Sequence, residues 1–143
     1  MARRSPVNLA RAEVLAFLEN IKDHPEDTPR LILADWLEEQ GDPRGEFIRI
    51  QCQRALLSEG DPRSAKLASR ARKLLAKHRD VWLGVLAEKG IQTDFRRGLV
   101  SVRGSARKLL SKRLGAAPPT EALAWVDRLQ VYDADAGAVA GRT

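Results

Sequence analysis

The chain has 143 residues, a length that suits one domain and allows a hydrophobic core without disulfide or metal staples. It carries 25 Lys and Arg against 19 Asp and Glu, a formal net charge of +6, and its single cysteine, Cys52, excludes an internal disulfide. The two histidines lie far apart, with no Cys or His at ligand spacing, so the composition predicts no structural zinc site and no cofactor.

The distribution of charge separates the chain into two parts. Residues 1–61 hold 8 Lys and Arg against 12 Asp and Glu, whereas residues 62–143 hold 17 against 7. This asymmetry predicts either an acidic partner for the second part or attraction between the two parts. No apolar run approaches the roughly 18 residues that span a bilayer, and no signal-peptide pattern is present, so we expect a cytoplasmic protein without a membrane span.

The first two helices are predicted from their caps and their apolar periodicity. The first runs over residues 9–22 with Asn8 as its N-cap. Its apolar stripe consists of Val14, Leu18 and Ile21. Thr28 is the expected N-cap of the second helix, Pro29 its first residue, and Gly41 the left-handed residue that ends it.

The third and fourth helices repeat the same type of start. Asp42 and Pro43 begin a helix that extends to about Glu59. Its inward side chains are predicted to be Phe47, Ile48, Cys52, Ala55 and Leu56. The fourth helix runs over residues 62–78, and Asp80 then caps a further short helical segment. The buried residues of the fourth helix are predicted to be Leu67, Ala71, Leu74 and Leu75.

The periodicity changes after Gly90. Residues 99–103 and 128–132 alternate as strands do, and turn-forming residues flank both segments. A helical stretch over residues 105–114 and a short segment over residues 120–126 lie between them. A strand, a crossover and a second strand predict a parallel, right-handed unit whose outer edge is not covered.

These elements predict an α+β fold. An N-terminal bundle of four to five helices precedes a small right-handed strand-helix-strand unit that resembles a single leucine-rich-type repeat. The expected parts are a flexible basic N-terminus at 1–8, a helical module at 9–90, and a repeat-like unit at 91–143. The last residues of this unit, 133–143, could form a disordered C-terminal tail.

The block from Thr28 to Gln51 carries a resemblance to a known family. It reads Thr-Pro-Arg-Leu-Ile-Leu-Ala-Asp-Trp-Leu-Glu-Glu-Gln-Gly-Asp-Pro-Arg-Gly-Glu-Phe-Ile-Arg-Ile-Gln. This run resembles the signature of the bacterial repeat-companion domain, over about residues 10–57. Trp82, Leu83 and residues 95–100 also resemble that family's lead into its first repeat strand.

The family's domain is a short helical module, usually followed by leucine-rich-type repeats, and has no assigned biochemical function. The resemblance therefore implies a capping or docking module and brings no catalytic residues. About one repeat-like unit follows the module in this chain. A partner could supply further repeats, or the short form could have another use.

The corner between the second and third helices gathers carboxylates, a tryptophan and an arginine. The structural-corner residues are Asp35, Trp36, Glu39, Asp42, Arg44 and Gly45. We expect Asp35 or Glu39 to accept hydrogen bonds from Arg44, Arg30 or Arg49, and Gly45 to let another helix approach closely. Partner docking and acid-base catalysis by the paired carboxylates are the alternatives.

Two basic groups follow in the second part of the chain. The basic stripe on the fourth helix consists of Arg63, Lys66, Arg70, Lys73 and Lys77. At 100° per residue these cations fall within an arc of about 80°. The second basic cluster consists of Arg96, Arg97, Arg103, Arg107, Lys108, Lys112 and Arg113. A continuous basic surface can bind a phosphate backbone, an acidic protein or membrane headgroups, or can simply be solvated.

The sequence thus favours a non-enzymatic interaction or capping module. It is expected to bind a protein partner through an exposed strand edge and charged faces, and a homo-oligomer could form through the same edge. The alternative is a nucleic-acid-binding protein that uses the basic stripe and the second basic cluster. An enzyme that uses Asp35 and Glu39 is a third hypothesis.

Overall fold

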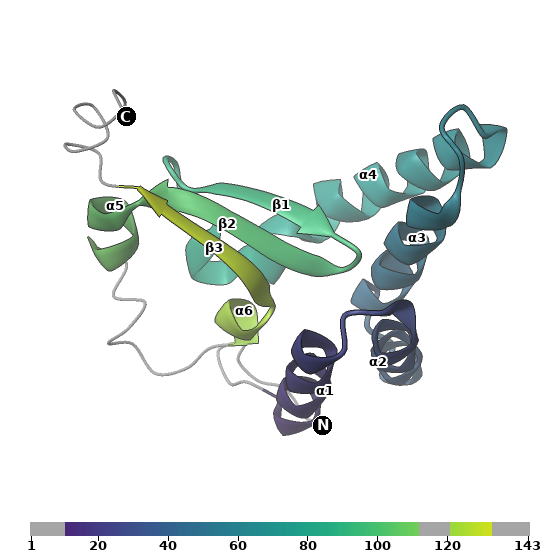
Figure 1. The fold of residues 1–143 in the computed structure, drawn as a ribbon, viewed down its shortest axis with the longest axis horizontal. Coiled ribbons are helices and arrows are strands. Elements are labelled where there is room, and N and C mark those ends of the chain that lie inside the picture. Colours follow the sequence, from purple (N-terminus) through teal and green to yellow (C-terminus); the bar gives the residue numbers. More distant parts are fainter. Residues whose placement is uncertain (1–10, 112–120, 133–143) are drawn as a thin grey trace.

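The computed structural model describes residues 11–111 and 121–132, and within them the fold is α+β as expected (Figure 1). The helical part consists of α1 (Ala12–Asp23), α2 (Asp27–Glu39), α3 (Arg44–Leu56), α4 (Pro62–Leu83) and the 3-10 turn η1 (Gly84–Leu86). The sheet part consists of β1 (Gln92–Arg96), β2 (Leu99–Ser105), α5 (Ala106–Ser111), α6 (Glu121–Ala124) and β3 (Val126–Tyr132).

The sheet has the strand order β1-β2-β3. β2 and β3 are parallel and joined through α5 and α6, which confirms the predicted strand-crossover-strand unit. β1 pairs with β2 in the antiparallel direction and was not predicted. The two residues of its hairpin turn, Arg97 and Gly98, both have positive φ, so an Arg-Gly pair replaces the Asn-Gly or Asp-Gly pair that usually marks such a turn.

The first two helices differ from prediction at their starts. α1 begins at Ala12, and the expected cap Asn8 lies outside the described residues. The predicted N-cap at Thr28 is wrong, because α2 begins at Asp27, two residues before the predicted first residue Pro29, and its N-cap is Glu26. Pro29 is tolerated there as the third helical residue, since the first turn's N–H groups have no intrahelical partners. Gly41 (φ +75°) follows α2 as predicted.

The third and fourth helices differ at their ends. α3 stops at Leu56, and the predicted burial of Ala55 and Leu56 is wrong because both side chains lie beyond the reach of the core. α4 continues through Asp80 to Leu83, so the predicted break there is also wrong. An exposed Asp costs less than about 1 kcal/mol inside a helix, and burial of Trp82 and Leu83 in the last turn outweighs that cost.

One hydrophobic core joins the helical part to the sheet. The predicted stripe of α1 is fully buried, and it packs in the same cluster as Leu33 and Leu37 of α2, Val100 and Val102 of β2, and Trp125. A second cluster fills the space between α3 and α4. Its buried members are Phe47, Ile50, Ala71, Leu74 and Trp82. The predicted boundary at residue 90 therefore separates the helical part from the sheet part, but the two parts share one hydrophobic core.

Candidate functional site

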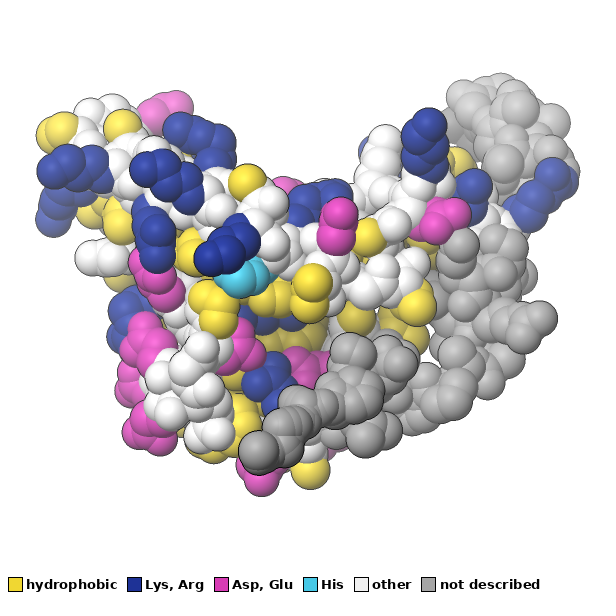
Figure 2. All heavy atoms as spheres, turned by 180° about the vertical axis from the view of Figure 1, so that it is seen from behind, with side chains coloured by type: hydrophobic (Ala, Val, Ile, Leu, Met, Phe, Trp, Pro, Cys, Tyr) yellow, Lys and Arg dark blue, Asp and Glu magenta, His cyan; other side chains and the backbone are white. Residues whose placement is uncertain are grey.

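The basic stripe of α4 is partly neutralised by acidic neighbours. The guanidinium of Arg70 forms two bonds to the Glu46 carboxylate, with Nε–Oε2 at 2.7 Å and Nη2–Oε1 at 2.9 Å, and these lower the pKa of Glu46. Arg63 Nη2 lies 2.8 Å from Asp61 Oδ2. Dark blue side chains follow the α4 arm in Figure 2. The stripe thus presents mainly the ammonium groups of Lys66, Lys73 and Lys77, for which the described residues provide no ion pair.

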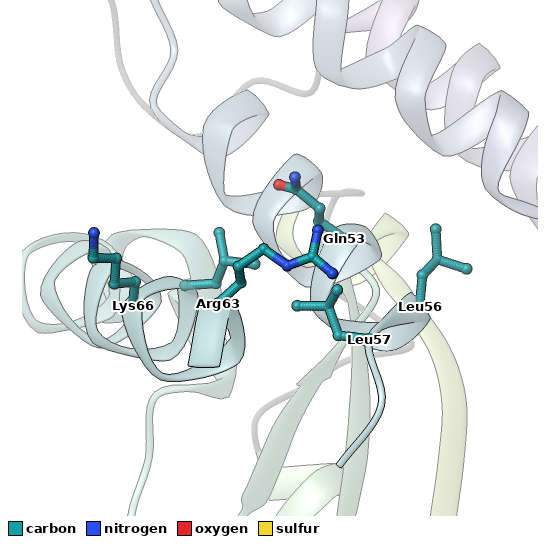
Figure 3. A pocket seen from close by; sticks show the side chains of 6 residues that line it. Gln53, Leu56, Leu57, Arg63 and Lys66 are labelled. Carbon is teal, nitrogen blue, oxygen red and sulfur yellow. The ribbon is translucent and has the colours of Figure 1, made fainter. Parts of the chain in front are cut away.

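An apolar pocket lies where the end of α3 meets the start of α4. Its volume is about 410 Å³. The side chains that line it are Gln53, Leu56, Leu57, Arg63, Lys66 and Leu67. Leu56 is 77% exposed because α3 ends there. In Figure 3 Leu56 and Lys66 lie on opposite sides of the pocket, and the Arg63 guanidinium extends toward Gln53. The sequence did not predict this pocket, because the apolar periodicity of the third helix placed Leu56 in the core.

The second basic cluster is spread over several elements. Arg96 and Arg103 are exposed on β1 and β2. Arg97 turns toward the helices, where its Nε lies 2.9 Å from Asp27 Oδ1 and its Nη2 donates to the Pro25 carbonyl at 2.9 Å. A further pair, Arg107 and Lys108, lies on α5. The remaining members, Lys112 and Arg113, lie outside the described residues.

Ion pairs join α2 to α3 at the corner between the two helices. Arg49 Nη2 bonds to Asp35 and lies 2.9 Å from Glu38 Oε1, so the predicted pairing with Asp35 is confirmed, while Glu38 takes the place expected for Glu39. The predicted close approach at Gly45 is also confirmed. A Cβ atom there would lie only 2.6 Å from the carbonyl oxygen of Ala34.

The other two arginines expected at this corner bind elsewhere. Arg30 donates to backbone carbonyls, at 3.1 Å to Arg97 and at 3.2 Å to Glu26. Arg44 is buried, and its guanidinium carbon lies 3.6 Å from the centroid of the Trp125 ring. Burial lowers the pKa of Arg44 to about 9, and neither Nε nor Nη2 has a hydrogen-bond partner within the described part of the chain.

The carboxylates nearest to the buried Arg44 guanidinium form their ion pairs with Arg11 and not with Arg44 itself. The N-cap of α3 is Pro43, one residue later than the predicted cap Asp42, and the Arg44 backbone N–H donates to Asp42 Oδ1 at 2.9 Å. Arg11 bridges Asp42 at 3.0 Å and Glu121 at 2.7 Å, and Glu121 also accepts from the indole N–H of Trp125 at 3.1 Å. These bonds fasten the segment before β3 to the start of α1 and α3.

β3 is an exposed edge strand, as the sequence predicted. Within the described residues its neighbour in the sheet is β2 alone. Leu129 pairs with Val102 and Val131 with Gly104, so these side chains lie on the core-facing side of the sheet. Leu129 is nevertheless 57% exposed and Val131 49% exposed. We call these two residues the β3 strip.

Cys52 is poorly placed to act as a nucleophile. Cys52 is buried, and desolvation raises the pKa of its thiol to about 11, which disfavours the nucleophilic thiolate. In the described part of the chain, no three His, Cys, Asp or Glu side chains gather to hold a metal ion. The helices at 11–111 and 121–132 include none long and apolar enough to cross a membrane.

Comparisons with known proteins leave the family resemblance untested. No model of a known protein family matches the sequence, and neither the curated proteins nor the solved structures give a match. The resemblance to the repeat-companion domain therefore stays a prediction that rests on the residues from Thr28 to Gln51.

Proposed function

We propose that this protein is an interaction module that binds an extended segment of a partner protein along the free side of β3. β3 has seven residues, a length of roughly 23 Å at about 3.3 Å per residue. Alternate backbone N–H and C=O groups of an edge strand point away from its neighbour and can pair with an added strand. Such pairing supplies affinity through the main chain and specificity through alternate side chains.

The observation that carries this proposal is the β3 strip. Leu129 and Val131 continue the core-facing row of Val102 and Gly104 beyond the part of the sheet that the helices cover. Covering two half-exposed aliphatic side chains is favourable by about 1 kcal/mol each. A partner strand with an apolar side chain facing the same way would extend the core by one row. The expected partner is therefore an extended segment with apolar residues at alternate positions.

The experiment uses a displayed library of nine-residue peptides with alternating apolar positions. Peptides that bind should shift amide resonances of β3, and Val131→Lys should weaken binding at least about tenfold because it places a charge in the apolar row. Gln130→Lys is the matched control, since Gln130 pairs with Arg103 and lies on the opposite face of the same strand. Binding that maps away from β3, or that both variants weaken equally, would contradict the proposal.

The nucleic-acid alternative is supported by Lys66, Lys73 and Lys77, which span about 16 Å along α4 at 1.5 Å per residue. Replacing these three lysines by Glu tests it more cleanly than replacing Arg70, because Arg70→Glu would place a second carboxylate beside Glu46. A nucleic-acid binder should lose its affinity for a short duplex in the triple variant, and its affinity should fall steeply with salt. Equal binding by both proteins would exclude this surface.

A further inference from the structure

We infer that the apolar pocket between α3 and α4 receives the outer face of α2 from a second copy of the chain. This surface differs from β3, so the inference goes beyond the proposed function. It rests on a match between two surfaces of the same molecule, one apolar and basic, the other apolar and acidic.

The outer face of α2 has an apolar centre and acidic neighbours. Its members recur at spacings of four, three and four residues: Thr28, Ile32, Asp35 and Glu39. At 100° per residue they fall within an arc of about 60°. Ile32 is 50% exposed, although its neighbour Leu33 is fully buried. The Asp35 side chain is 66% exposed even while it pairs with Arg49.

The pocket has the complementary character. Leucine side chains form its walls and two cations, Arg63 and Lys66, lie at its rim (Figure 3). An aliphatic side chain such as Ile32 fits easily within about 410 Å³. With Ile32 in the pocket, Glu39 of one copy could pair with Lys66 of the other. Neither Glu39 nor Lys66 has an ion-pair partner among residues 11–111 and 121–132.

The two surfaces are neighbours on one side of the molecule. Arg49 of α3 bonds to Asp35 and Glu38 of α2, and Gln53 lies one turn further along α3 and lines the pocket. Arg49 and Leu56 are separated by about 10 Å along the helix axis. Two copies related by a twofold axis near Arg49 and Gln53 could therefore make both contacts at once. Such an isologous arrangement closes at a dimer.

The expected dimer is weak. Each contact buries one aliphatic side chain and forms one exposed ion pair, and exposed ion pairs add little affinity because water and salt screen them. Two copies of this small contact predict an interface below the size of most specific interfaces, with a Kd on the order of hundreds of micromolar. Screening of the ion pairs should weaken the dimer further as salt rises.

A charge exchange tests the inference by sedimentation velocity of the full chain, from about 20 µM to about 1 mM. Lys66→Glu and Glu39→Lys should each weaken the dimer at least tenfold, because each places like charges in both contacts. The double variant should recover an affinity within about threefold of the original. Lys77→Glu and Glu13→Lys are the matched controls, since they make the same charge changes at exposed positions away from the contacts.

Three outcomes would overturn the inference. The unaltered protein could be monomeric throughout the range, the double variant could fail to recover, or the controls could weaken the dimer as much as the test variants. Val131→Lys separates this surface from the β3 edge: it should leave the dimer intact. A dimer that Val131→Lys abolishes and Lys66→Glu does not would be formed by strand pairing instead.

Discussion

The guanidinium of Arg44 stacks on the ring of Trp125, with its carbon 3.6 Å from the ring centroid. Arg44 begins α3, and Trp125 directly precedes β3, so this contact joins residues 81 positions apart in the sequence. Trp82 and Phe95 surround the same guanidinium at 5.3 and 5.9 Å. Cation–π attraction to three rings partly compensates a charge that has lost its water.

The effect of replacing Arg44 on the free energy of unfolding should depend on the shape of the new side chain more than on its charge. Arg44→Met keeps a long apolar chain against Trp125 and removes an incompletely hydrogen-bonded cation. We expect its free energy of unfolding to be unchanged or raised by up to about 2 kcal/mol. Arg44→Ala should lower it by about 2 to 4 kcal/mol, because it leaves a cavity. Urea denaturation measures both, and Arg72→Met at an exposed position of α4 is the control. Equal losses in the two Arg44 variants would show that the charge itself stabilises the fold.

Cys52 should make stability fall at alkaline pH. Burial raises the pKa of its thiol to about 11 from an ordinary value near 9, so the folded state keeps a proton that the unfolded state releases. The stabilisation is fully present below about pH 9 and is lost as the pH rises through 11, by about 2 to 3 kcal/mol.

The check for this prediction is urea denaturation of the protein and of Cys52→Ala between pH 8 and 11. The loss of stability over that interval should be smaller in the variant, although the variant starts from a lower value because it leaves a small cavity. In the folded protein the thiol should also react slowly with an alkylating reagent at pH 8. Parallel pH curves and a fast reaction would both argue against a buried, protonated thiol.

Gly45→Ala should destabilise the corner between α2 and α3. The added Cβ would lie 2.6 Å from the Ala34 carbonyl oxygen and 2.9 Å from Glu38 Cγ, so the two helices would have to separate. Overpacking costs about 1 to 3 kcal/mol, whereas the higher helix propensity of Ala returns at most about 1 kcal/mol. We expect a net loss of about 1 to 2 kcal/mol by thermal or urea unfolding.

A comparison at a different glycine tests this explanation. Gly41→Ala meets no atom within 4 Å, but Gly41 has a φ of +75°, so the cost there comes from the backbone alone. The Gly45→Ala loss should shrink when Glu38→Ala removes one of the two clashing groups. The Gly41→Ala loss should not respond to that second change.

Local patterns in the sequence predicted much of the fold. The prediction of a buried stripe on α1 was correct because three large apolar residues at helical spacing lie on the same face of a helix, and that face packs against the core. The predictions that β2 and β3 are strands and that they run parallel were also correct. β1 was missed because it is short and its Arg97-Gly98 turn lacks the residues that usually mark a hairpin.

The candidate surfaces were harder to predict because they depend on distant contacts. The cations of the basic stripe lie on one face of α4, as the helical spacing predicted. The pairing of Arg70 with Glu46 could not be predicted, because it depends on how α3 packs against α4. The burial of Arg44 requires rings from α4, β1 and the segment before β3. The pocket exists because α3 ends at Leu56, three residues earlier than the caps suggested.

The shared core also constrains how this protein can be taken apart or recombined. Val14 and Leu33 of the helical part pack in the same cluster as Val100, Val102 and Trp125 of the sheet part. Removing either part would expose a row of large apolar side chains on the other. The two parts should therefore melt together in one cooperative transition, and a hybrid that grafts the helices onto another protein would have to carry the sheet with them.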